Sequence, residues 1–67
     1  MNEYEIENIL TDELKEQILE IRRDGKYNMF DVYNVQKEAY DKGFYRLVLF
    51  LEGSREQYIN FILTGSR

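Results

Sequence analysis

The sequence predicts an all-α fold, a compact bundle of three to four short helices. Four glycines, Gly25, Gly43, Gly53 and Gly65, separate segments in which apolar residues recur at intervals of three and four, the period of an α-helix. The segment between Gly43 and Gly53 has five consecutive apolar residues, 47–51. Five consecutive residues cover the whole circumference of a helix. We therefore expect this segment to be the central element or the centre of a self-association surface.

The first helix is expected over residues 12–24. Thr11 is a suitable N-cap, and two acidic residues follow it in the first turn, where the helix dipole favours negative charge. Arg22 and Arg23 in the last turn and Gly25 just after it are typical of a helix C-terminus. The expected apolar stripe consists of Leu10, Leu14, Ile18 and Ile21.

Residues 1–10 are expected to form a loosely held acidic arm, and residues 11–67 a single helical domain. Alternation in Glu3–Glu7 suits an extended segment, but Ile6 also continues the spacing of the first helix. The sequence leaves helix, strand and disorder open for this arm.

A second helix is expected over residues 31–42, capped by Asp31 and ended by Gly43. Its apolar positions are Val32, Val35, Ala39 and Tyr40. The connector before it contains Met29 and Phe30, which we expect to pack beneath the helices because both are apolar.

The last two helices are expected over residues 44–52 and 55–64. The first of them also has the composition of a strand, but no partner strand is near. Residues typical of helix ends also flank it on both sides. Ser54 and Gln57 have the spacing of a capping box. Leu47 and Phe50 should be among the most buried residues, surrounded by Leu14, Ile18, Val35, Phe61 and Ile62; Tyr58 and Ile59 complete the apolar side of the last helix.

Composition leaves little material for catalysis. The 67 residues include no histidine and no cysteine, so no imidazole base, thiolate or disulfide is available. Glu13, Glu16 and Glu20 share a helix face, yet no calcium-binding loop accompanies them. We expect no enzymatic activity, no catalytic residues, no metal and no cofactor.

No apolar run approaches the roughly 18 residues of a membrane span, and the first residues do not resemble a signal peptide. The expected location is the cytoplasm.

Charge is unevenly distributed along the chain. Residues 1–20 contain seven acidic residues and one lysine, a formal charge of −6, whereas residues 21–67 have a formal charge of +2. Such a field attracts basic surfaces and repels nucleic-acid backbones. Glu13, Glu16 and Glu20 are therefore candidate residues for binding a partner protein with a basic surface, although a solvated helix face explains them as well.

Tyrosines are the second candidate for binding. Five of them, Tyr27, Tyr33, Tyr40, Tyr45 and Tyr58, cannot all be buried in so small a core. Tyrosine is also enriched at protein interfaces. We expect a partner-binding face that includes Tyr33 and Tyr45, with ordinary half-buried tyrosines as the simpler alternative. A homodimer is a further expectation, because small domains without disulfides or metals often gain stability by association.

A helix-turn-helix spacing supports a second class of function. Ala39, Gly43, Phe44 and Leu49 match the small residue, turn glycine and packed positions of that motif. Its second helix would offer DNA mainly apolar side chains and a single base, Arg46, whereas DNA affinity requires several phosphate contacts. Nucleic acid is thus an unlikely partner, and a nucleic-acid-associated regulator remains the alternative hypothesis.

Residues 18–64 resemble a family of short proteins of unknown function carried by phages and prophages of Gram-positive bacteria. The most specific shared words are Asn28-Met29-Phe30-Asp31 and Gly43-Phe44-Tyr45; further shared residues are Ile21, Arg22, Gly25, Gln36, Ala39, Tyr58, Phe61 and Ile62. The resemblance implies a mobile-element origin and an all-helical fold, and it supplies no catalytic residues. By analogy with small acidic phage proteins, the leading hypothesis is an interaction protein that inhibits or redirects a host nucleic-acid enzyme, such as a CRISPR nuclease.

Overall fold

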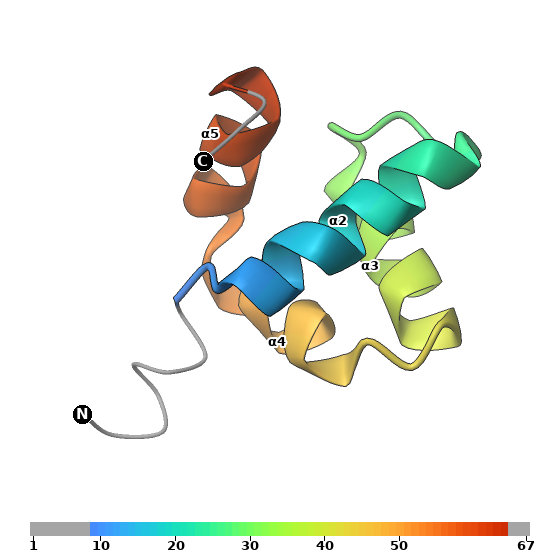
Figure 1. Ribbon diagram of the computed structural model, residues 1–67, viewed down its shortest axis with the longest axis horizontal. Helices are drawn as coiled ribbons and strands as arrows, with labels where there is room; N and C mark the ends of the chain where they lie inside the picture. The colour runs from blue at the N-terminus through green and yellow to red at the C-terminus, as the bar shows by residue number, and fades with distance from the viewer. Residues whose placement is uncertain (1–8, 65–67) are drawn as a thin grey trace.

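The computed structural model describes residues 9–64, and every secondary-structure element in this range is a helix (Figure 1). The helices are α2 (Asp12–Asp24), α3 (Val32–Asp41), α4 (Tyr45–Gly53) and α5 (Arg55–Thr64). The predicted all-α class is confirmed, and each predicted helix boundary is within one residue of the observed one. The predictions for most of the acidic arm and for Gly65 fall outside the described residues.

Local capping interactions fix the ends of α2. The Thr11 hydroxyl accepts a hydrogen bond from the backbone N–H of Leu14 at 3.2 Å, which satisfies one of the free donors of the first turn. At the other end Gly25 has a φ of 67° and donates its N–H to the carbonyl of Arg22. Leu10, placed in the predicted arm, packs against the core. This contact agrees with the predicted place of Leu10 in the apolar stripe of the first helix.

The connection from α2 to α3 is a turn followed by a cap. The side chain of Asn28 accepts a hydrogen bond from the backbone N–H of Phe30, and the backbone N–H of Asp31 donates to the carbonyl of Asn28. Asp31 then caps α3 by accepting from the backbone N–H of Asn34. Only half of the prediction for the connector's apolar pair is confirmed: Met29 packs against the core, whereas Phe30 is exposed.

Helix α3 ends in a Schellman turn. The backbone N–H of Gly43 donates to the carbonyl of Tyr40, and the N–H of Phe44 donates to the carbonyl of Ala39. Gly43 has a φ of 81°, as expected for a glycine in the left-handed region. This turn lets α4 follow α3 with only three residues between them.

Helix α4 is the centre of the bundle, as its apolar sequence predicts. It makes extensive contacts with α2, α3 and α5, and Leu47, Phe50 and Leu51 are fully buried. Around them lie Leu14, Ile18, Ile21, Val35, Ala39, Tyr58 and Phe61. The predicted core is therefore confirmed, except that Ile62 is only partly buried.

Candidate interaction surface

Three exposed tyrosines lie on α3 and at the start of α4. Tyr33 and Tyr40 are seven residues apart, so two helical turns place them on the same side of α3. Tyr45 is the first residue of α4, and its ring packs against that of Tyr40, with 5.5 Å between the centroids and a tilt of 58°. The three side chains are 72% (Tyr33), 62% (Tyr40) and 60% (Tyr45) exposed. We refer to Tyr33, Tyr40 and Tyr45 as the tyrosine face.

Tyr40 was predicted among the apolar positions of the second helix, but its side chain is exposed. The buried side of α3 is formed by Val35, Glu38 and Ala39. Tyr40 is about 100° around the helix from Ala39 and about 140° from Val35, which turns it away from α4 and toward solvent. Its spacing of seven residues from Tyr33 was the signal that could have identified it as part of the exposed face.

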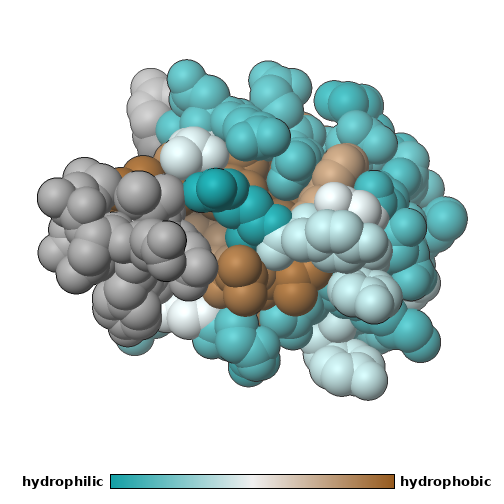
Figure 2. Space-filling view, turned by 90° about the horizontal axis from the view of Figure 1, so that it is seen from below, coloured by the Kyte–Doolittle hydropathy of each residue, from teal (hydrophilic) through white to brown (hydrophobic). Residues whose placement is uncertain are grey.

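The outer side of α4 lies close to the tyrosine face. Leu49 is one turn after Tyr45 and is 49% exposed, because the opposite side of the helix carries the buried residues Leu47 and Leu51. Figure 2, which views the molecule from below α4, shows apolar side chains gathered in the middle of this face and hydrophilic ones around them. The surface around the α3–α4 turn thus combines aromatic and aliphatic groups.

Tyr58 does not belong with the exposed tyrosines. It is fully buried, and its hydroxyl donates a hydrogen bond to the carbonyl of Met29 at 2.5 Å. This bond ties α5 to the connector between α2 and α3. Burial disfavours the charged phenolate and raises the pKa of Tyr58 well above its ordinary value.

The candidate acids of α2 separate into two groups. Glu13 and Glu16, in the first half of the helix, are exposed to solvent. Glu20 instead lies 3.5 Å from the Nζ atom of Lys42, at the end of α3. Its charge is therefore partly balanced within the molecule, which leaves Glu13 and Glu16 as the two solvent-facing acids of the predicted set.

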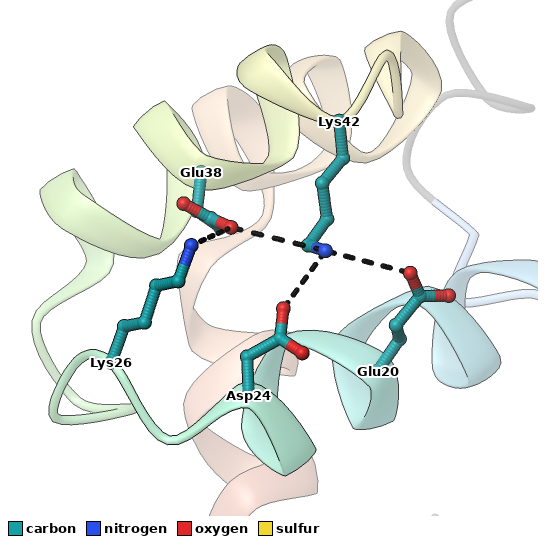
Figure 3. Close-up of polar contacts among 5 residues, drawn as sticks. All are labelled: Glu20, Asp24, Lys26, Glu38 and Lys42. Atoms are coloured by element: carbon teal, nitrogen blue, oxygen red, sulfur yellow. Dashed lines mark ion pairs between the residues drawn. The ribbon is translucent and has the colours of Figure 1, made fainter.

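Lys42 is the centre of an ion-pair cluster between α2 and α3 (Figure 3). Its Nζ atom lies 2.8 Å from a carboxylate oxygen of Asp24 and 3.9 Å from one of Glu38, whose other neighbour is Lys26 at 3.6 Å. The hydrogen bond from Lys42 lowers the pKa of Asp24, and the same bond raises the pKa of Lys42. The partly covered amine and the buried Glu38 hold the C-terminus of α3 against α2. Because Glu38 and Lys42 lie on either side of Tyr40 in the chain, the cluster also holds the backbone that carries Tyr40.

The observed burial of residues in α3 and α4 agrees only in part with a helix-turn-helix motif. Ala39 is buried and Gly43 forms a tight turn, as the motif requires, but Leu49 is not a packed position. Leu51, in the second helix of the motif, is fully buried and cannot contact DNA. The outer side of α4 presents Tyr45, Arg46, Leu49 and Glu52, in which one base is opposed by one acid.

Residues 9–64 contain neither a cluster of metal ligands nor a membrane-spanning helix. No group of three or more carboxylates in this range is arranged to hold a metal ion. The longest described helix, α2, has 13 residues, and no helix in the same range has the length and apolarity needed to cross a membrane.

The fold and this surface define a small all-α domain with an exposed aromatic face. The model of the family described as "Domain of unknown function (DUF5049)" matches residues 10–66, so the chain belongs to that family. No curated protein and no solved structure matches the chain.

Residues that carried the sequence resemblance have structural roles in the fold. Asn28 and Asp31 form the turn and the cap before α3, Gly43 and Phe44 form the Schellman turn, and Tyr58 closes the bundle onto Met29. Within the two sequence motifs that carried the resemblance, Asn28–Asp31 and Gly43–Tyr45, only Tyr45 also belongs to the tyrosine face. The resemblance therefore reports on the architecture of the domain more than on a binding site.

Proposed function

We propose that the protein is a small interaction protein that binds a partner protein with a basic surface, through the tyrosine face and with steering by the acids of α2. The observation that carries the proposal is the tyrosine face itself, three exposed rings on two helices, two of which pack together across the α3–α4 turn. Tyrosines provide large contact areas at low conformational cost and are enriched among residues that dominate binding energy. A domain that needed these rings only for folding would bury them.

Rigidity of the face supports the proposal. The Schellman turn fixes the direction of α4 after α3, and the Lys42 cluster anchors the same turn to α2. Gln36 adds a further link, because its side-chain amide donates to the carbonyl of Val48 and to the carboxylate of Glu52 at 3.0 Å and 3.1 Å. A preorganised face loses less conformational freedom on binding.

The partner in this proposal is a host nucleic-acid enzyme, which the protein inhibits or redirects. Nucleic-acid enzymes carry basic grooves, and Glu13 and Glu16 offer exposed negative charge to such a groove. The resemblance to short phage and prophage proteins supports a mobile-element setting, a cytoplasmic location in the host cell, and a role against a defence nuclease. The role is one of binding rather than catalysis.

The first experiment is capture of a partner from the lysate of a Gram-positive host by the immobilised protein. A variant with Tyr33, Tyr40 and Tyr45 all changed to Ser should lose the partner, and Tyr27→Ser is the matched control, because Tyr27 is an exposed tyrosine of the connector. Circular dichroism checks that both variants remain helical. Equal capture by the two variants, or no capture by the parent, would contradict the proposal.

A kinetic measurement on the recovered partner separates the two contributions. Charge reversal at Glu13 and Glu16 should slow association most at low salt, whereas loss of the tyrosines should speed dissociation. Glu20 is left unchanged because reversing its charge would disturb Lys42. Association that is indifferent to both salt and charge reversal would remove the electrostatic part of the proposal.

The alternative function is a nucleic-acid-associated regulator built on the α3–α4 corner. The tight turn at Gly43 is the observation that favours it. Salt-sensitive retention of the protein on bare duplex DNA, lost in an Arg46→Ala variant, would support this function over the first.

A further inference from the structure

The end of α2 and the connector after it form a basic and aromatic part of the surface that the proposed function does not use. Arg22, Arg23 and Lys26 are exposed there, together with the rings of Tyr27 (38%) and Phe30 (50%). Figure 1 shows this part of the chain at the upper right, whereas the acidic start of α2 lies on the left. We refer to Arg22, Arg23, Lys26, Tyr27 and Phe30 as the connector patch.

The positive charge of the connector patch is largely uncompensated. Asp24 is the one acid in this stretch of the chain, and its carboxylate is bound by Lys42 at 2.8 Å. Within residues 9–64, no carboxylate pairs with the guanidinium of Arg22 or Arg23. The helix dipole favours cations at this end of α2. Both guanidinium groups nevertheless remain available to an anionic ligand.

The ring of Phe30 is held at the surface by a hydrogen-bonded turn. The N–H of Phe30 donates to the side chain of Asn28 at 2.9 Å, and Asp31, the next residue, caps α3. Met29, the residue before, packs against the core and accepts the hydrogen bond of Tyr58. The neighbours of Phe30 therefore stabilise the fold, while its own ring stays half exposed. A ring fixed in this way loses little conformational freedom when a ligand stacks on it.

We propose that the connector patch binds single-stranded nucleic acid. Proteins that bind single strands combine cations, which contact the phosphates, with aromatic rings, on which unpaired bases stack. The two arginines supply the cations, and Tyr27 and Phe30 supply the rings. Lys26 adds a third cation, because its contact with Glu38 at 3.6 Å leaves its side chain 60% exposed.

The rings distinguish a single strand from other anionic ligands. In a duplex the bases stack on one another, so only an unpaired base offers its face to Phe30. An anionic membrane would attract the cations, but surface binding also requires an apolar helix face that enters the lipid, and the last turn of α2 is charged. An acidic polypeptide would use the cations and leave the rings without a flat partner.

Three cations limit both the affinity and its salt dependence. For single strands the logarithm of the binding constant falls with the logarithm of salt concentration by about 0.7 per phosphate contact, which gives a slope of about −2 here. Because the formal charge of the chain is −4, we expect weak binding, with a Kd of about 10–500 µM at about 50 mM salt. The connector patch shares no residue with the tyrosine face. Its test requires no partner protein and does not depend on the proposed function.

Fluorescence anisotropy of a labelled dodecathymidylate, titrated with the full chain, measures the binding. Phe30→Ser should weaken it about fivefold or more. Leu49→Ser is the matched control, because Leu49 is 49% exposed and lies outside the patch. Circular dichroism verifies that both variants fold. No binding by the parent at up to about 1 mM protein, or equal weakening by the two variants, would overturn the proposal.

Two double variants of equal net charge test where the cations act. Arg22→Gln with Arg23→Gln should weaken binding about tenfold or more and bring the slope to about −0.7. Arg46→Gln with Arg55→Gln removes two exposed cations from α4 and α5 and should change the affinity little. Equal effects of the two double variants would overturn the proposal, because the overall charge would then explain the binding.

Three further probes test the other ligands. A duplex of the same length and a labelled dodecaglutamate peptide carry negative charge without unpaired bases, and both should bind at least about fivefold more weakly than the dodecathymidylate. Equal binding of either probe would overturn the proposal. Retention on phosphatidylserine vesicles without binding to the dodecathymidylate would also overturn it, in favour of a membrane surface.

Discussion

Removing the hydroxyl of Tyr58 should weaken the domain in a way that depends on pH. Tyr58→Phe keeps the ring in the core and deletes only the hydrogen bond to the carbonyl of Met29. A hydrogen bond of this kind contributes about 1 kcal/mol to the free energy of unfolding. The variant should therefore be less stable than the parent by about 1 kcal/mol near pH 8, which corresponds to about 4–8 °C in Tm for a domain of this size.

The sign of the pH dependence follows from the raised pKa of Tyr58. Its folded pKa lies above the ordinary value of 10.0, so above pH 10 the unfolded chain loses this proton while the folded chain keeps it. The parent then loses stability by up to about 1.4 kcal/mol for each pH unit. Tyr58→Phe has no such proton, and the contribution of Lys42, which is also lost in alkali, is common to both proteins.

The stability that the hydrogen bond gives the parent and the stability that the parent loses through ionisation of Tyr58 in the unfolded chain should cancel between about pH 10.5 and 11. Parent and variant are then equally stable. Urea unfolding followed by far-UV circular dichroism at pH 8, 9, 10 and 11 measures the difference. Tyr33→Phe is the matched control, because it removes a hydroxyl from an exposed ring and should change stability little. A stability difference that stays constant from pH 8 to 11, or no difference at pH 8, would refute the reasoning.

Two further substitutions test the core and the turn by the same unfolding assay. Phe50→Ala should cost about 3–5 kcal/mol because it leaves a cavity at the centre of the bundle, and Leu49→Ala, at the exposed neighbour, should cost far less; equal costs would place the core elsewhere. Gly43→Val should cost on the order of 1–3 kcal/mol, solely through its φ of 81°, since a Cβ there meets no neighbouring atom. Gly43→Asn should cost less, because Asn tolerates the left-handed region, and a valine variant as stable as the parent would contradict the assigned turn.

Local chemistry explains which parts of the fold the sequence could predict. Thr11, Gly25, Asp31 and Gly43 act on backbone groups within four residues of themselves. Interactions of such short range are contained in a few consecutive letters, so the helix boundaries were correct within one residue. The central position of α4 was predictable for a similar reason, because five consecutive apolar residues require cover on every side.

The candidate surface was predicted only in part. Tyr33 and Tyr45 are exposed, as a binding face requires, and the prediction that the five tyrosines cannot all be buried is confirmed. Tyr40, predicted among the apolar positions of the second helix, is exposed, whereas Tyr58 is fully buried. Periodicity defines an apolar arc on each helix, and residues near the edge of that arc are covered or exposed according to where the neighbouring helix lies. Ile62 was misjudged for the same reason, whereas Phe30 lies in the connector, where no helical period indicates which side faces the core.

By itself the sequence determined the helices, their ends, the central segment and the lack of histidine and cysteine chemistry. The tertiary structure decided which side chains meet across helices: Tyr40 with Tyr45, Tyr58 with Met29, and Lys42 with Glu20 and Asp24. Each of these pairs depends on the packing angle between helices, which is set by the shape of the whole core rather than by any one segment. That is why the acids of α2 look equivalent in the sequence, yet in the fold Glu20 pairs with Lys42 while Glu13 and Glu16 face solvent.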